Sequence, residues 1–110
     1  MTDQAALIGA GANVNERDSD GATPLMFAIG DPQILQLLIA GGSNVNEQDK
    51  DGYTALMLAA RRGNVASLRV LLAEGADMNL RSRRGFTALS LARKNHHQKV
   101  SRLLSEVQSL

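Results

Sequence analysis

The residues of this chain that could carry acid–base, nucleophilic or metal chemistry are few, and their spacing suits none of these reactions. The chain has no cysteine, which excludes thiolate catalysis, disulfides and cysteine-ligated metals together. Its only histidines, His96 and His97, are adjacent and point in different directions, whereas a zinc site needs spaced ligands. Asp49 and Asp51 stand near neither a phosphate-binding loop nor a nucleophile. We therefore expect no enzyme activity, no bound metal and no cofactor.

Charge is the property that divides this chain most clearly. Residues 1–60 hold eight acidic and two basic residues, a net charge of −6, and residues 61–110 hold ten basic and three acidic residues, a net charge of +7. An acidic segment of another protein would be attracted to the basic half, mainly through its association rate and orientation. Whether these charges share one surface depends on the elements that carry them.

Those elements follow from an internal repeat, which is sought first because it determines the whole fold. A Gly-x-Thr pattern recurs with spacings of 31 and 33 residues, at Gly21, Gly52 and Gly85. A second pattern ends in an Asn six residues before each of these glycines, at Asn15, Asn46 and Asn79. Two patterns in constant phase predict three similar units.

Each unit is expected to contain a hairpin turn, a helix, a tight turn and a second helix. The hydroxyls of Thr23, Thr54 and Thr87 suit the N-caps of the first helices, and Gly63 suits the end of one, because glycine adopts positive φ easily. In the second unit, a one-sided apolar stripe predicts the second helix; it consists of Val65, Leu68, Leu71 and Leu72. His96 and His97 align with Gly63 and Asn64 at such a helix start. The first unit lacks two residues after Ile29, so we expect its first helix to be short.

The order Gly-x-Thr-Pro-Leu-x-x-Ala, Leu-Leu, Gly-Ala-Asp-x-Asn resembles the ankyrin repeat over residues 5–110. The resemblance implies an all-α solenoid of stacked helix-turn-helix units with short hairpin turns. It implies a single domain over residues 1–110, made of a partial repeat at 1–17 and of repeats at about 18–48, 49–81 and 82–110. Residues 5–15 look like the tail of a second helix, so we expect either missing upstream repeats or a cover at this end. The family's usual His after Thr-Pro-Leu is replaced here, so we expect its hydrogen bond to the Thr to be absent; the replacements are Met26, Met57 and Ser90.

The resemblance also implies a non-catalytic scaffold or adaptor that binds a protein on the concave side formed by hairpins and first helices. Carried onto this sequence, the first unit contributes Asp18, Ser19, Asp20 and Ala22, and the third also contributes Asn95. The expected partner-binding residues are Lys50, Asp51, Tyr53, Arg61, Arg62, Arg81, Arg83, Arg84, Phe86 and Lys94. Tyr53 and Phe86, taken as exposed on their turns, would anchor the partner, because aromatics and arginine dominate interface energetics.

Other interpretations stay open at this point. Charged turns often serve only to keep a protein in solution, and the Tyr53 ring could instead lie over its own hairpin. A shortened first helix also occurs in ankyrin-type inhibitors of cyclin-dependent kinases, so an enzyme regulator is an alternative. Weak nucleic-acid binding by the basic run at 81–84 is another, although the acidic first half disfavours it. Head-to-tail self-association of the two halves is a third. With no readable signal or membrane segment, we expect a cytoplasmic protein, with the nucleus as the alternative, and no membrane partner.

Overall fold

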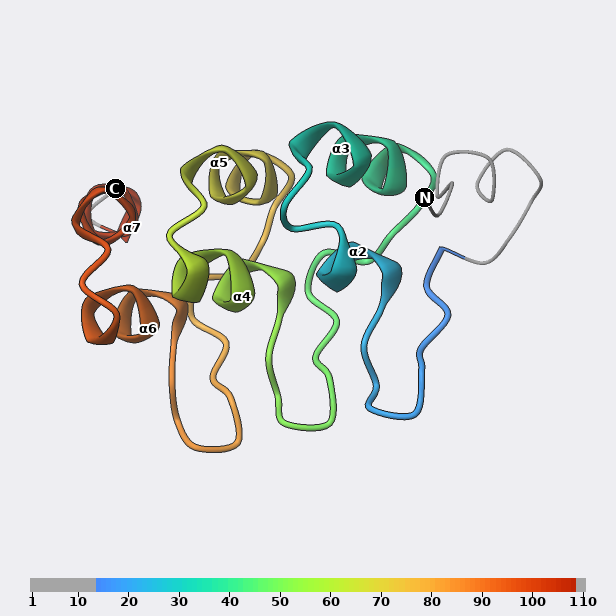
Figure 1. Ribbon diagram of the computed structural model, residues 1–110, viewed down its shortest axis with the longest axis horizontal. Helices are drawn as coiled ribbons and strands as arrows, with labels where there is room; N and C mark the ends of the chain where they lie inside the picture. The colour runs from blue at the N-terminus through green and yellow to red at the C-terminus, as the bar shows by residue number, and fades with distance from the viewer. Residues whose placement is uncertain (1–13, 109–110) are drawn as a thin grey trace.

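The computed structural model describes residues 14–108, so the interpretation of residues 5–15 lies almost wholly outside the described residues. Within that range the chain forms three helix pairs and no strand, as Figure 1 shows. The first helices are α2 (Pro24–Phe27), α4 (Ala55–Arg62) and α6 (Ala88–Lys94), and the second helices are α3 (Pro32–Ala40), α5 (Val65–Ala73) and α7 (Gln98–Gln108). The two sets form two layers, and long turns project beyond the first helices. The predicted all-α solenoid is confirmed.

The core lies between and within these two layers. Its largest fully buried side chains are mostly leucines, including Leu25, Leu35, Leu56, Leu68 and Leu104. Burying such a side chain contributes about 1.5–3 kcal/mol. Fully buried alanines on α4 and α6 allow the first helices to approach each other closely. The stack therefore depends on small side chains within one layer and leucines between the layers.

The predicted caps are confirmed in two units and wrong in one. The hydroxyls of Thr54 and Thr87 each accept a hydrogen bond from the amide three residues later, at 3.2 Å. Thr23 is also an N-cap, but its buried hydroxyl makes no hydrogen bond within residues 14–108. The reason is that the Met26 amide donates instead to the Thr23 backbone oxygen at 3.0 Å, closing a tighter turn at the start of a helix of only four residues.

A second correction concerns the side chain that follows Thr-x-Leu in the third unit. We expected no side-chain hydrogen bond to the Thr there. Instead, Ser90 Oγ accepts from the Thr87 amide at 2.8 Å and donates to the Thr87 backbone oxygen at 3.0 Å. The bond forms because a hydroxyl at the third helical position can reach back to the N-cap, as in a capping box.

The expected short first helix is confirmed, and hydrogen bonds from the next unit meet the backbone that follows it. The backbone oxygen of Ile29 accepts hydrogen bonds from Asn64 Nδ2 at 2.9 Å and from the buried Ser67 Oγ. The third unit repeats the contact, since His97 Nε2 lies 2.8 Å from the Arg61 backbone oxygen. His97 directly precedes α7, and its own oxygen accepts from the Ser101 amide. The helix-start interpretation of this histidine is therefore confirmed.

Candidate functional site

Two aromatic side chains at the base of successive hairpins each carry a cation over their ring. The guanidinium carbon of Arg61 lies 5.2 Å from the centroid of the Tyr53 ring, and Lys94 Nζ lies 4.7 Å from that of Phe86. In both units the ring follows the hairpin glycine, and the cation belongs to the last turn of the first helix. A cation within about 6 Å of a ring is attracted by about 0.5–1 kcal/mol at an exposed site. The second and third units thus present the same pair twice.

The two rings are less accessible than the sequence suggested. Tyr53 and Phe86 are half-buried and pack against the hydrophobic core, because the residue after the hairpin glycine leads directly into the capped helix. The expectation that the two rings are exposed is therefore wrong, and their role as anchors of a partner stays a prediction. The outer faces of the rings contact Arg61 and Lys94, and both of these cationic side chains are exposed.

The third hairpin and the second enclose a surface hollow of about 490 Å³ lined by Asp51, Tyr53, Ser82, Arg83 and Arg84. The hairpins are joined through their backbones, since the Arg83 amide donates to the Asp51 oxygen at 2.9 Å. Ser82 Oγ accepts from the Phe86 amide at 3.1 Å and so shapes the turn from within. The two arginine side chains remain exposed.

Two acidic residues of the first half stabilise the hairpin turns by accepting hydrogen bonds from backbone amides. Asp49 Oδ1 accepts from the amides of Asp51 and Tyr53, both at 2.9 Å. Asp18 Oδ1 does the same in the first hairpin, with the amides of Asp20 and Ala22. Such bonds stabilise tight turns. The other carboxylates at the tips of these two hairpins are Asp20 and Asp51, and both are exposed.

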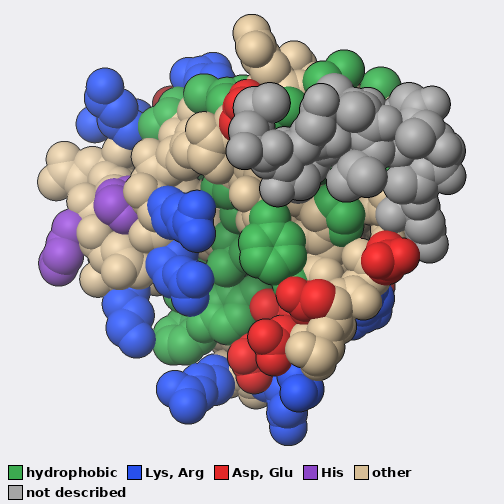
Figure 2. All heavy atoms as spheres, turned by 45° about the vertical axis from the view of Figure 1, so that its right-hand side comes forward, with side chains coloured by type: hydrophobic (Ala, Val, Ile, Leu, Met, Phe, Trp, Pro, Cys, Tyr) green, Lys and Arg blue, Asp and Glu red, His purple; other side chains and the backbone are tan. Residues whose placement is uncertain are grey.

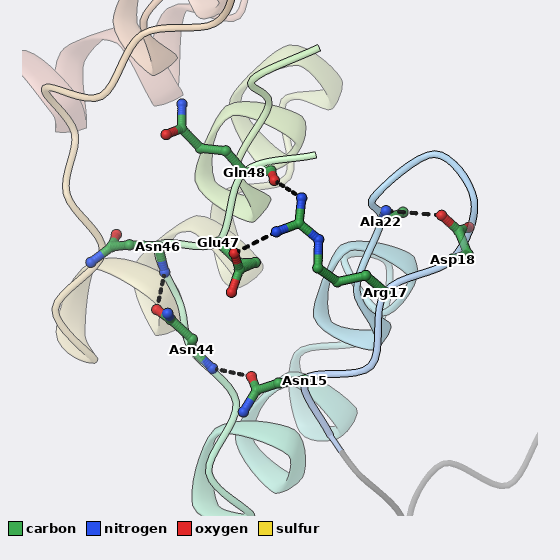
Figure 3. Close-up of polar contacts among 8 residues, drawn as sticks. All are labelled: Asn15, Arg17, Asp18, Ala22, Asn44, Asn46, Glu47 and Gln48. Carbon is green, nitrogen blue, oxygen red and sulfur yellow. Dashed lines mark hydrogen bonds and ion pairs between the residues drawn. The ribbon is translucent and has the colours of Figure 1, made fainter. Parts of the chain in front are cut away.

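A ladder of polar contacts joins the first unit to the second (Figure 3). Arg17 donates to Glu47 at 2.9 Å and to the Gln48 backbone oxygen at 2.7 Å, and Asn15 Oδ1 accepts from the Asn44 amide at 2.7 Å. Asn46 Oδ1 repeats the last contact with the Asp77 amide. These side chains hold neighbouring units in register, so the guanidinium of Arg17 serves in contacts between units.

The structure places the ten expected site residues along the second and third units. Tyr53 and Phe86 are half-buried and the others are exposed: Lys50, Asp51, Arg61, Arg62, Arg81, Arg83, Arg84 and Lys94. Figure 2 shows one face on which hydrophobic side chains lie between basic side chains on one side and acidic side chains on the other. The sequence analysis missed Phe27, which is 68% exposed. The signal available for it was a large apolar residue beside the two-residue deletion.

The described residues offer little for other classes of site. Within residues 14–108, no three His, Asp or Glu side chains come close enough to hold a metal ion. In the same part of the chain, no helix combines the length and apolar character needed to cross a membrane.

Comparison with known families agrees with this geometry. A family model described as "Ankyrin repeats (3 copies)" matches residues 4–81 and 28–109, which together span nearly the whole chain. No curated protein matches the sequence closely enough to count as a relative.

Proposed function

The chain belongs to the ankyrin-repeat family, and from that premise we propose that it is a non-catalytic scaffold or adaptor. Repeats of this kind form extended surfaces that bind other proteins. In this chain the partner binds the hairpin and first-helix side of the second and third units. The basic half favours an acidic segment of that partner.

The observation that carries the proposal is a set of basic side chains without a carboxylate partner. The only ion pair among the described residues joins Arg17 to Glu47 in the acidic half. The cations of α4, α6 and the third hairpin are exposed and form no ion pair within residues 14–108. An acidic segment would supply the missing opposite charge without breaking an existing pair.

Two of these cations are already held in place. Arg61 and Lys94 rest over half-buried rings, so their side chains lose less freedom on binding than side chains projecting freely into water. Ordering a long side chain at an interface costs about 0.5–1.5 kcal/mol. The two cation–aromatic pairs therefore favour binding by reducing this cost.

A charge-reversal experiment tests the proposal. Acidic peptides enriched by display selection on the wild-type chain are labelled with fluorescein and titrated with the chain. The same peptides are titrated with the triple variant Arg81→Glu, Arg83→Glu and Arg84→Glu, and with the control Arg69→Glu, whose exposed side chain lies on α5. We expect the triple variant to bind about tenfold more weakly or worse, a loss of at least about 1.4 kcal/mol, and the control to bind like the wild type.

Two results would overturn this function. One is a selection that enriches peptides without acidic residues, and the other is an equal loss of affinity in the triple variant and in Arg69→Glu. A random DNA duplex serves as the third probe. Tighter binding to the duplex than to the peptides, with steep salt dependence, would favour the nucleic-acid alternative.

Regulation of an enzyme such as a kinase is a second candidate, supported by the four-residue α2. It makes the same surface the contact with the enzyme. Adding the wild-type chain and the triple variant to a panel of protein kinases tests it, because only the wild type should change a kinase rate. Equal rates with and without the wild-type chain across the panel would remove this candidate.

A further inference from the structure

Phe27 is more exposed than the equivalent residue of either other unit. Its side chain is 68% exposed, whereas Leu91 at the same position of α6 is 3% exposed and Leu58 of α4 is half-buried. The other large exposed apolar side chain among residues 14–108 is Leu37, at 46%, and it lies on α3 in the other layer. Phe27 is therefore the apolar side chain that stands out along the first helices.

The exposure follows from the early end of α2. In α4 the helix continues from Leu58 to Arg62, and in α6 it continues from Leu91 to Lys94. Helical side chains lean toward the N-terminus, so residues three and four positions later cover the residue before them. Helix α2 ends at Phe27 itself. The two-residue deletion thus removes the turn that would cover the ring.

The next unit contacts the backbone that follows α2 but leaves the ring exposed. Asn64 and Ser67 donate to the oxygen of Ile29, while Phe27 stays exposed beside α4, against which α2 packs. Single exposed apolar residues are common on proteins, so exposure alone assigns no role. The charges at the ends of the next two first helices supply the second observation. The last turn of α4 carries Arg61 and Arg62, and that of α6 carries Lys94.

We propose that Phe27 is the apolar anchor of a docking strip that runs from α2 over the ends of α4 and α6. This inference rests on the proposed function and specifies the partner. Its occupant is an extended protein segment with one apolar side chain on Phe27, followed along the strip by acidic side chains that contact Arg61 and Arg62 and then Lys94.

The spacing of the segment follows from the geometry of the stack. Neighbouring packed helices lie about 8–10 Å apart, and an extended chain advances about 3.3–3.6 Å per residue. One unit therefore corresponds to about three residues of the partner. The acidic residues should lie about three and about six residues from the apolar one, because the strip crosses two further units.

The charges of the hairpins set the direction of the segment along the strip. Asp20 is exposed at the first hairpin, whereas Arg83 and Arg84 are exposed at the third. A carboxylate would be repelled near the first unit and attracted toward the second and third units, whose first helices also end in cations. The same combination of signs disfavours a purely basic segment at the helix ends.

Parallel display selections test the anchor. Random twelve-residue peptides are selected on the wild-type chain, on Phe27→Ala and on the matched control Leu37→Ala, which removes the other exposed apolar side chain. We expect the wild type and the control to enrich peptides in which an apolar residue lies about three residues from the nearest Asp or Glu, on either side of it. On Phe27→Ala we expect acidic peptides without the apolar position. The wild-type peptides should bind this variant about five- to tenfold more weakly, as for an interface aromatic that is truncated.

The outcomes separate this inference from the proposed function. Acidic peptides without a preferred apolar position on the wild type, or the same apolar preference on Phe27→Ala, would overturn the anchor while leaving the acidic-partner proposal intact. An equal loss in Leu37→Ala would also overturn it. Selection of peptides without acidic residues would remove both. An apolar–acidic spacing of about six residues per unit would indicate a helical occupant and contradict the extended segment.

Discussion

The clearest test of the fold compares two threonines that occupy the same position in successive units. Thr54 and Thr23 are both buried N-caps of first helices. Thr54 Oγ1 accepts from the Met57 amide at 3.2 Å, whereas Thr23 Oγ1 has no hydrogen-bond partner in the described part of the chain. Replacing each by valine keeps the shape of the side chain and removes only the hydroxyl. The pair therefore isolates the contribution of one hydrogen bond.

The structure sets the size and the sign of the two effects. Thr54→Val leaves the buried Met57 amide without its acceptor, and loss of a capping side chain costs about 0.5–2 kcal/mol. Thr23→Val removes a buried hydroxyl that bonds to nothing, which recovers a desolvation penalty of about 1 kcal/mol or more. We expect the free energies of unfolding of the two variants to differ by about 1.5–3 kcal/mol, with Thr23→Val the more stable.

Urea unfolding followed by far-ultraviolet circular dichroism measures this difference, and thermal unfolding checks it. A difference of about 1 kcal/mol shifts the melting temperature by about 4–8 °C in a domain of this size class. Thr87→Val is an internal control that should resemble Thr54→Val, because its hydroxyl also caps a helix. Equal destabilisation by Thr23→Val and Thr54→Val would refute the reasoning, since the hydroxyl of Thr23 would then be making an equivalent bond.

Three further predictions follow from the packing of neighbouring units. Gly52 and Gly85 share a positive φ, but a Cβ at Gly52 would lie 2.8 Å from the Arg83 amide nitrogen, and one at Gly85 would meet nothing within 4 Å. Gly52→Ala should therefore lower the melting temperature clearly more than Gly85→Ala, which costs about 1 kcal/mol. His97→Ala should lose a hydrogen bond worth about 1 kcal/mol. His97→Asn should keep an equivalent bond, as Asn64 does in the second unit, and should therefore unfold at a higher urea concentration than His97→Ala. Asn64→Ala should lower the free energy of unfolding by about 1–2 kcal/mol, measured in urea. It removes both the bond to Ile29 and the cap of α5, in which Asn64 Oδ1 accepts from the Ser67 amide.

The architecture was predictable because the units repeat their signals. Thr, Leu, Ala and Gly recur in constant phase, so each element is specified several times and a local exception does not change the fold. The exceptions themselves were not readable from composition. The bond that Met26 makes to the Thr23 backbone, and the return of Ser90 Oγ to Thr87, depend on local backbone geometry. Met26 and Met57 occupy the same position, yet the Met26 amide donates to a backbone oxygen and the Met57 amide to a threonine hydroxyl.

The binding surface was only partly predictable, because the sequence determines which residues lie on a hairpin but not how deeply each packs. Arg61 and Lys94 were expected at the ends of the first helices, and they lie there. Their placement over Tyr53 and Phe86 depends on side-chain packing, although the constant separation of ring and cation in both units was visible in the sequence. Phe27 was missed because exposure in a helix depends on the residues that follow, and here the helix ends at the ring.

The shortened α2 keeps the usual backbone contact with the next unit but leaves one side chain uncovered. The Ile29 oxygen, just after α2, accepts from Asn64 and Ser67, and His97 makes the equivalent contact with the Arg61 oxygen of the longer α4. A buried carbonyl without a partner would cost free energy that the whole stack must offset. An exposed phenylalanine costs far less, because it forgoes burial without stranding a polar group in the core. Folding therefore requires the hydrogen bonds at Ile29 but no cover for Phe27, and this difference leaves an apolar side chain exposed on α2, which packs against α4.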